Sequence, residues 1–307
     1  MMSEFCAKSI NVRYQGGASA IRQFDLTFSG HILSVFGKEC DGKTTLINAL
    51  AGLTTYEGSF LLDNETISTS PKNNDCFAIL EDFSLIPNKS VYENLSFPLT
   101  LRGYSIEETA VIVNKAVLEF GLYKYIYTKV RDLSRQVKSY VAMAKIKLVP
   151  RKLYLIDDVL KYLDFDERAI CFKKLCEVLK SVDGFVIYAT SNYDEALSIG
   201  DKTVLIYGGV IEQYGTSDEL KKFPTSVRTA ELASDGNTVF EFGLLSRNNE
   251  NLYINCNGNI ICLDGCLNRL IDESYIGDEV LFAKYVYDNC WQYLLMDSET
   301  ERTILVY

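Results

Sequence analysis

The sequence predicts an α/β fold: a largely parallel sheet covered by helices, followed by a small all-β domain. Three observations predict it. Strand-like runs alternate with helical patterns, a glycine-rich loop joins one such strand to a helix, and the pattern changes after about Glu231. At 307 residues the chain is long enough for one large and one smaller domain, which we expect over residues 1–231 and 232–307.

The strand-like runs before the glycine-rich loop are Ser9–Tyr14, Phe24–Phe28 and Ile32–Phe36. An apolar helical pattern, Lys43–Leu53, follows the loop, so a strand, a loop and a helix are expected in that order. Later strands and helices alternate in the same way. The predicted strands are Cys76–Leu80, Leu153–Asp157, Phe185–Thr190 and Thr203–Tyr207, and the predicted helices include Ile106–Phe120 and Asp166–Leu179. Such alternation is typical of a parallel sheet with helices on its faces.

Beyond residue 231, Asn, Gly and Asp separate short alternating runs such as Asn251–Asn255, Asn259–Leu263 and Val280–Tyr287. This pattern predicts a small β domain. From Gly236 onward the chain has eleven Asp or Glu residues against four Lys or Arg, so we expect the surface of that domain to be acidic.

The overall charge and the cysteines restrict the partners and the compartment. The net charge is −10 and no block of five basic residues occurs, which argues against a nucleic-acid partner. Nine cysteines at irregular spacing are typical of reduced thiols rather than of a disulfide framework. The N-terminus lacks a signal pattern, and no run approaches the roughly 18 apolar residues of a spanning helix, so we expect a cytoplasmic protein.

The glycine-rich loop matches the pattern G-x-x-x-x-G-K-[ST] at every fixed position. Its residues are Gly37, Lys38, Glu39, Cys40, Asp41, Gly42, Lys43 and Thr44. The glycines let the backbone wrap closely, so that successive N–H groups point at the β-phosphate of a nucleotide. We expect Lys43 to neutralise the β- and γ-phosphates, the Thr44 hydroxyl to coordinate Mg²⁺, and Thr45 to belong to the same nucleotide-binding set. The alternative is a glycine turn before an amphipathic helix.

Further residues stand in the order found in the ABC transporter ATPases: Tyr14, the loop at Gly37, Leu133-Ser134, Asp157-Asp158 and Asp164. The chain resembles that family over about residues 3–220, most closely the ATPase subunits of sugar and other solute importers. The resemblance implies ATP and Mg²⁺ as ligands, a helical subdomain at about residues 82–150, and ATP hydrolysis coupled to transport. It also implies transmembrane permease subunits, a second ATPase subunit and a solute-binding protein as partners. The location would be peripheral, on the inner face of the cell membrane.

The resemblance gives individual residues a role, each with a structural alternative. Tyr14 resembles the aromatic residue that stacks on adenine, the alternative being a core tyrosine. Asp157 resembles the carboxylate that orients Mg²⁺, the alternative being a helix cap. Glu81 stands in place of a glutamine between the two lobes, where it could reach Mg²⁺ or be an ordinary surface residue. Asp164 ends a segment that resembles the family's D-loop.

Other positions depart from the family pattern. Asp158 replaces the catalytic Glu and is one methylene shorter, so we expect slower hydrolysis. Ser191 replaces the switch histidine, and the only histidine of the chain, His31, is no catalytic candidate. The signature L-S-G-G-Q here reads Leu133-Ser134-Arg135-Gln136-Val137. Ser134 and Arg135 would cover ATP held by the opposite subunit, where Arg135 either replaces a backbone contact or blocks closure.

Lys43, Thr44 and Asp157 keep the family pattern, whereas the catalytic positions depart from it. We therefore expect the chain to bind nucleotide even where it hydrolyses it poorly. We expect an ATPase that is weak or inactive alone and acts as the degenerate half of a heterodimer. The alternative is an ATP-dependent regulatory or structural ABC protein with little or no hydrolysis. The sugar importers carry an OB-like regulatory domain after the ATPase domain, and Leu295–Glu301 resembles its closing segment.

Overall fold

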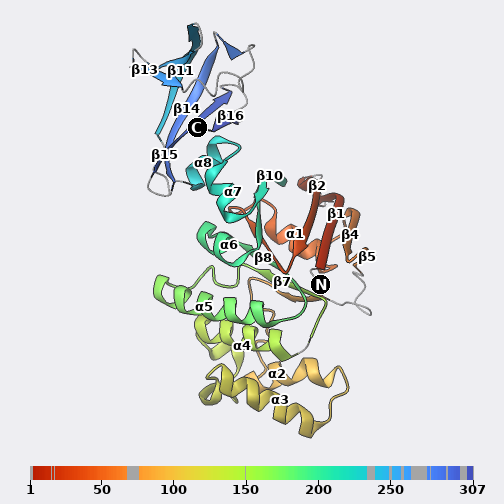
Figure 1. Ribbon diagram of the computed structural model, residues 1–307. Coiled ribbons are helices and arrows are strands. Elements are labelled where there is room, and N and C mark those ends of the chain that lie inside the picture. The colour runs from red at the N-terminus through yellow and green to blue at the C-terminus, as the bar shows by residue number, and fades with distance from the viewer. Residues whose placement is uncertain are drawn as a thin grey trace. The chain divides into compact units, whose positions relative to one another are not determined.

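The computed structural model describes residues 3–14, 16, 18–67, 76–148, 150–233, 239–248, 251–256, 259–263, 275–276, 278–287, 290–297 and 303–306. The chain divides into two compact units, Met1–Ile211 and Glu212–Tyr307 (Figure 1). Each unit is described by itself. The domain bounds that the sequence predicts, residues 1–231 and 232–307, stay a prediction.

The first unit is built on a six-stranded sheet in the order β10-β9-β3-β8-β7-β6, and the boundary between the two units falls within β10. Its strands are β3 (Ile32–Phe36), β6 (Cys76–Ile79), β7 (Leu153–Asp157), β8 (Phe185–Thr190), β9 (Lys202–Tyr207) and β10 (Val210–Gly215). β3 pairs in parallel with β8 and β9, and β7 pairs in parallel with β6 and β8. Every residue of β3, β7 and β8 is buried, as expected for strands covered on both faces. The predicted, largely parallel sheet is confirmed.

A second sheet of the first unit is antiparallel, and the sequence pattern alone did not separate it from the first. Its order is β2-β1-β4-β5, with β1 (Ser3–Arg13), β2 (Ser19–Gly30), β4 (Glu57–Leu62) and β5 (Glu65–Thr66). The connection between β1 and β2 is too short for a parallel crossover, which needs a dozen or more residues. Buried and exposed residues alternate along most of β2, so one face of this sheet is covered.

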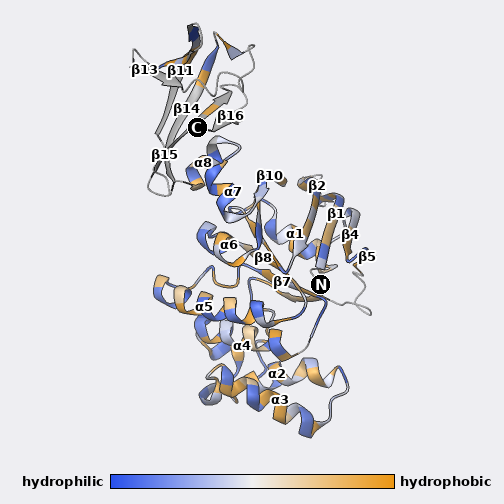
Figure 2. Ribbon diagram, in the orientation of Figure 1, coloured by the Kyte–Doolittle hydropathy of each residue, from blue (hydrophilic) through white to orange (hydrophobic). Residues whose placement is uncertain are grey.

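The helices of the first unit are α1 (Lys43–Leu50), α2 (Val91–Thr100), α3 (Ile106–Glu119), α4 (Arg135–Leu148), α5 (Phe165–Ser181) and α6 (Tyr193–Ile199). α1 ends before the predicted Leu53, because Gly52 adopts a φ of 73° that interrupts the helix. α2, α3 and α4 pack against one another around a common apolar core. Ser90 and Ser105 begin α2 and α3 with capping boxes. Figure 2 shows hydrophobic and hydrophilic residues alternating along α3 and α5, as on amphipathic helices.

The second unit has two short helices and an antiparallel sheet. The helices are α7 (Ser217–Lys222) and α8 (Val227–Ala233), and the sheet order is β13-β12-β11-β14-β15-β16. The strands are β11 (Val239–Asn248), β12 (Asn251–Cys256), β13 (Asn259–Leu263), β14 (Glu279–Tyr287), β15 (Cys290–Asp297) and β16 (Thr303–Val306). Strands therefore occur where the sequence predicts a small β domain, and that domain itself stays a prediction. Its OB-like character stays a prediction, and residues 298–301 of the segment on which that resemblance depends lie outside the described residues.

None of the helices in the described residues combines the length and the apolar character that crossing a bilayer requires.

Candidate functional site

The phosphate loop leaves the end of β3 and leads directly into α1, so the predicted order of strand, loop and helix is confirmed. The Lys43 ammonium lies inside the loop, where Nζ donates hydrogen bonds to the carbonyl oxygens of Gly37 at 2.7 Å and Lys38 at 2.9 Å. Only 6% of Lys43 is exposed. The Lys43 ammonium, which the sequence predicts to bind the phosphates, is therefore already positioned inside the loop by backbone carbonyl oxygens.

The conformation of the loop depends on one glycine and one carboxylate. Gly42 has a φ of 107°, and a Cβ atom there would lie 2.8 Å from the carbonyl oxygen of Ala20. The Asp41 carboxylate accepts hydrogen bonds from the backbone N–H of Lys38 at 2.7 Å and of Gly208 at 3.1 Å. Asp41 thus fixes the loop to the turn after β9, a structural role that the loop pattern did not assign to it.

Asp157 ends β7 beside the start of α1, and it is 1% exposed. No described residue donates a hydrogen bond to either carboxylate oxygen, although Thr44 and Lys43 lie close enough to stabilise its charge. A buried carboxylate without a partner, next to a threonine hydroxyl, fits the oxygen ligands that Mg²⁺ prefers. The helix-capping alternative is not what the structure shows, since Asp157 lies within a strand.

Burial raises the pKa of Asp157 to about 6, and Asp158 and Glu81 add to this effect, whereas Thr44 and Lys43 oppose it. Mg²⁺ requires the deprotonated carboxylate, so we expect Mg²⁺-dependent nucleotide binding to be full above about pH 7 and to weaken as the pH falls through 6. An aspartate with an ordinary pKa would lose this binding nearer pH 4. Equilibrium binding from pH 5 to 8 measures the effect.

Asp157→Asn is the control for that pH dependence, because it removes the titrating carboxylate but leaves the phosphate groups of the nucleotide unchanged. A pH profile of the wild type that matches the profile of Asp157→Asn would contradict the expectation.

Asp158 and Ser191 meet at the ends of neighbouring strands. The Ser191 hydroxyl donates a hydrogen bond of 2.7 Å to Asp158 Oδ2, while Oδ1 is buried without a partner among the described residues. Asp158 also has a positive φ of 43°, which is uncommon for a residue with a side chain. The structure thus brings together the residues that stand at the family's catalytic Glu and switch histidine. The Ser191 hydroxyl thus occupies one acceptor position of the Asp158 carboxylate, which would have to orient the attacking water.

A buried network supports the Ser191 loop, and the sequence analysis missed it. Glu195 on α6 accepts hydrogen bonds from Arg168 at 2.5 and 3.0 Å, from the Tyr188 hydroxyl at 2.8 Å and from the Thr190 hydroxyl at 3.1 Å. Glu195 is 5% exposed. The network joins α5, β8 and α6, and so fixes the turn that carries Ser191.

Glu81 follows β6 and reaches the same region, but it is paired with a cation. Its carboxylate lies 3.0 Å from Lys161 Nζ. A hydrogen bond from Tyr162 and the interaction with Lys161 lower the pKa of Glu81. The predicted role of Glu81 near Mg²⁺ therefore requires that the metal compete with Lys161.

Tyr14 contacts the first turn of α1, where its hydroxyl lies 2.7 Å from the Thr45 hydroxyl. The tyrosine is 46% exposed, so a ring surface is open to solvent instead of being enclosed in a core. Stacking of adenine on Tyr14 stays a prediction.

The signature and D-loop residues lie at the starts of α4 and α5. Ser134 accepts a hydrogen bond from the Val137 backbone N–H at 3.3 Å, and Asp164 caps α5 through the Glu167 backbone N–H at 2.8 Å. The Arg135 guanidinium lies over the Tyr162 ring, 4.6 Å from its centre. Arg135 is thus engaged by the D-loop segment of its own chain. Both roles that the sequence leaves open for Arg135, replacing a backbone contact to ATP or blocking closure of the two subunits, stay predictions.

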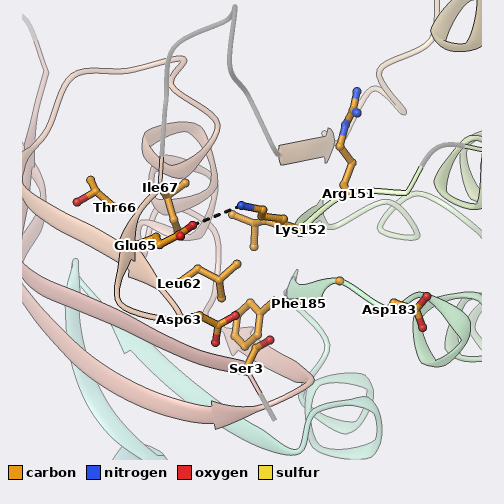
Figure 3. Close-up of a pocket in the computed structure, with 12 residues that line it drawn as sticks. Ser3, Leu62, Asp63, Glu65, Thr66, Ile67, Arg151, Lys152, Asp183 and Phe185 are labelled. Atoms are coloured by element: carbon orange, nitrogen blue, oxygen red, sulfur yellow. Dashed lines mark hydrogen bonds and ion pairs between the residues drawn. The ribbon is translucent and has the colours of Figure 1, made fainter. Parts of the chain in front are cut away.

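A cavity of about 500 Å³ lies at the amino-terminal ends of β7 and β8, opposite the end of the sheet that carries the phosphate loop (Figure 3). Arg151 and Lys152 before β7 and Phe185 at the start of β8 line it, and Lys152 pairs with Glu65 at 3.4 Å. Because β7 and β8 run in parallel, their first residues lie a strand length from Asp157 and the phosphate loop. A ligand in this cavity would not reach Lys43, so the cavity is not the nucleotide site.

Comparisons with known proteins agree with this geometry. Residues 22–161 match the family described as ABC transporter. The chain is 29% identical over 232 residues to the trehalose import ATP-binding protein SugC of Mycobacterium tuberculosis, covering 75% of this chain and 59% of SugC. It is 30% identical over 217 residues to the spermidine/putrescine import ATP-binding protein PotA of Salmonella typhimurium, covering 70% of this chain and 57% of PotA.

A solved structure shares the fold. CbiO1 from Clostridium perfringens, described as part of the ABC transporter complex CbiONQ, superposes with a TM-score of 0.62 at 23% identity. The match covers 70% of this chain and 89% of CbiO1. This chain therefore spans less than two thirds of the length of the importer proteins SugC and PotA, but most of the length of CbiO1. Residues 22–161, which include the phosphate loop and Asp157, are therefore an ABC transporter domain.

Proposed function

We propose that the chain is the ATP-binding, energy-coupling subunit of an ABC importer for a sugar or another solute. The observation that carries the proposal is that two groups suited to MgATP lie close together: the Lys43 ammonium enclosed by the loop, and the buried carboxylate of Asp157, which has no hydrogen-bond partner among the described residues. Lys43 would bind the β- and γ-phosphates, while Thr44 and Asp157 would hold Mg²⁺ directly or through water. Bound Mg²⁺ would neutralise charge on the phosphates during their transfer.

The named relatives support a transport role over the regulatory alternative. SugC and PotA are import ATP-binding proteins by their descriptions, for trehalose and for spermidine or putrescine. By analogy, this chain would work with transmembrane permease subunits, which would receive the solute from a solute-binding protein, and it would lie on the inner face of the membrane. The second unit would be the OB-like regulatory part of such a subunit.

The same proposal includes weak hydrolysis by the chain alone. Asp158 is a shortened carboxylate, and Ser191 supplies a neutral hydroxyl where the family has an imidazole. The signature begins with Leu133 and Ser134 but continues with Arg135. A positioned acid or base contributes roughly 10²–10⁴-fold to the rate of a reaction, so these changes together should leave slow turnover.

A second ATPase subunit follows from the head-to-tail arrangement of the family, in which each ATP lies between the phosphate loop of one subunit and the signature of the other. Two copies of this chain would form two identical, incomplete sites. With an intact partner, Ser134 and Arg135 would cover the ATP on the partner's own catalytic residues. A guanidinium there can donate hydrogen bonds to phosphate in place of backbone N–H groups. We therefore propose a heterodimer.

The purified chain is expected to hydrolyse ATP at least about a hundredfold more slowly than a typical enzyme turnover of ~10 s⁻¹. Asp158→Glu alone should recover little of this activity, because Ser191 and Arg135 remain. Phosphate release measures the turnover, and sedimentation with MgATP measures self-association. A stable homodimer that turns over at a normal rate would contradict both the weak hydrolysis and the heterodimer.

A further inference from the structure

Three charged side chains from distant parts of the chain meet beside the phosphate loop. Lys161 Nζ lies 2.9 Å from Glu39 Oε1 and 3.0 Å from Glu81 Oε1. Glu39 belongs to the phosphate loop, Glu81 follows β6, and Lys161 lies in the turn after β7. We refer to these three residues as the Lys161 bridge. It joins three of the segments that the candidate site is built from.

The backbone fixes where Lys161 stands, whereas its ion pairs remain exchangeable. The Lys161 backbone N–H donates a hydrogen bond of 3.0 Å to the Asp158 carbonyl oxygen, so the turn places Lys161 relative to both Asp157 and Asp158. The Lys161 side chain is 20% exposed, but those of Glu39 and Glu81 are 73% and 36% exposed. Ion pairs with such exposed carboxylates contribute little to stability, so a stronger ligand can replace them.

The charges around the site leave a role for such a cation. The carboxylates of the site include Glu39, Asp41, Glu81, Asp157 and Asp158. Among the described residues, the ammonium groups that contact the phosphate loop are those of Lys43 and Lys161. A triphosphate adds several negative charges, and its capture by a chain of net charge −10 depends on cations placed locally. The loop's own lysines are the enclosed Lys43 and the exposed Lys38, so a further ammonium group beside the loop adds to a small number of local cations.

We propose that Lys161 is a second phosphate-binding cation of the nucleotide site, held between Glu39 and Glu81 until Mg²⁺ takes its place on Glu81. This inference rests on the proposed ATP-binding function and deepens it. The Glu81 carboxylate would bind Mg²⁺ in place of the ammonium group, because the metal ion carries twice the charge. Lys161, then paired with the exposed Glu39 alone, donates hydrogen bonds to the γ-phosphate, the outermost group of the nucleotide. ADP lacks that group, so Lys161 favours ATP over ADP.

The first test compares MgATP and MgADP binding to Lys161→Met by equilibrium dialysis. Loss of one charge-assisted hydrogen-bonding partner should weaken MgATP binding about tenfold and MgADP binding less than about twofold. Lys152→Met is the matched control, because Lys152 pairs with Glu65 at the opposite edge of the sheet. The control should bind both nucleotides like the wild type. Equal weakening of ATP and ADP by Lys161→Met, or no weakening, would overturn the proposal.

The second test removes one of the two carboxylate partners of Lys161 without the metal, and leaves Glu39 as the other. In EDTA, Glu81→Gln should strengthen ATP binding about fivefold, because Lys161 no longer has Glu81 as a partner. In the Lys161→Met background the same substitution should strengthen binding less than about twofold, since only the loss of charge repulsion remains. Equal gains in the two backgrounds would mean that repulsion alone is relieved, and the proposal would be wrong.

The outcomes separate this proposal from the proposed function. If the wild type binds neither nucleotide, both are wrong. If the wild type binds MgATP, Lys43→Ala does not, and Lys161→Met keeps the wild-type preference for ATP over ADP, only the role of Lys161 fails. Circular dichroism of each variant confirms that the fold is kept.

Discussion

Lys43→Ala is expected to abolish MgATP binding, with a loss of at least about a hundredfold in affinity. The ammonium group is enclosed by the loop and held by the carbonyl oxygens of Gly37 and Lys38, so it stands where the phosphates must enter. Alanine would leave the β- and γ-phosphates without a charged donor inside the loop. Equilibrium dialysis with labelled ATP measures the loss.

Lys89→Ala is the control for Lys43→Ala, because Lys89 is an exposed lysine that pairs with Glu93 in the helical part of the first unit. This variant should bind MgATP like the wild type. An unchanged affinity in folded Lys43→Ala would remove the basis of the proposed function.

Glu195→Ala is expected to destabilise the first unit by about 3–5 kcal/mol, the typical result of removing one partner from a buried ion pair. The substitution would leave the Arg168 guanidinium, whose side chain is 19% exposed, without its carboxylate. It would also remove the acceptor of the fully buried Tyr188 hydroxyl. Urea unfolding followed by circular dichroism measures the change.

A matched surface pair provides the comparison. Lys174 and Glu177 lie on the same helix as Arg168 and form an ion pair of 3.1 Å with side chains 30% and 55% exposed. Glu177→Ala should change the free energy of unfolding by less than about 1 kcal/mol. Similar losses for Glu195→Ala and Glu177→Ala would show that the buried network does not hold the Ser191 turn.

The structural elements around the candidate site that the sequence predicted correctly are those with strong local patterns. The spacing of Gly37, Gly42 and Lys43 between a predicted strand and a predicted helix indicates a phosphate loop, and the apolar run before Asp157 predicts a buried strand with a carboxylate at its end. Parallel pairing then brings the end of β7 beside the start of α1, which places Asp157 near Thr44. Strand, loop, helix and carboxylate could therefore be predicted together.

Contacts between distant segments could not be predicted in the same way. Glu195 and Asp194 look alike in the sequence as acidic residues in the first turn of a helix, yet Glu195 is buried and Asp194 is exposed. Lys161 meets Glu39 and Glu81 only because three separate turns converge. The antiparallel β1–β2 sheet likewise depends on which strands pair, and that is decided by the length of a turn rather than by the composition of either strand.

The division into two units gives each of them its own spectroscopic reporter. The chain has one tryptophan, Trp291, and it lies on β15 of the second unit. Indole emission excited near the red edge of absorption, where tyrosine contributes little, therefore reports the second unit alone. Far-ultraviolet dichroism is dominated by helices, and the long helices α3, α4 and α5 belong to the first unit. Coincident melting curves by the two signals would indicate that the units unfold together, and separated curves would give two independent transitions.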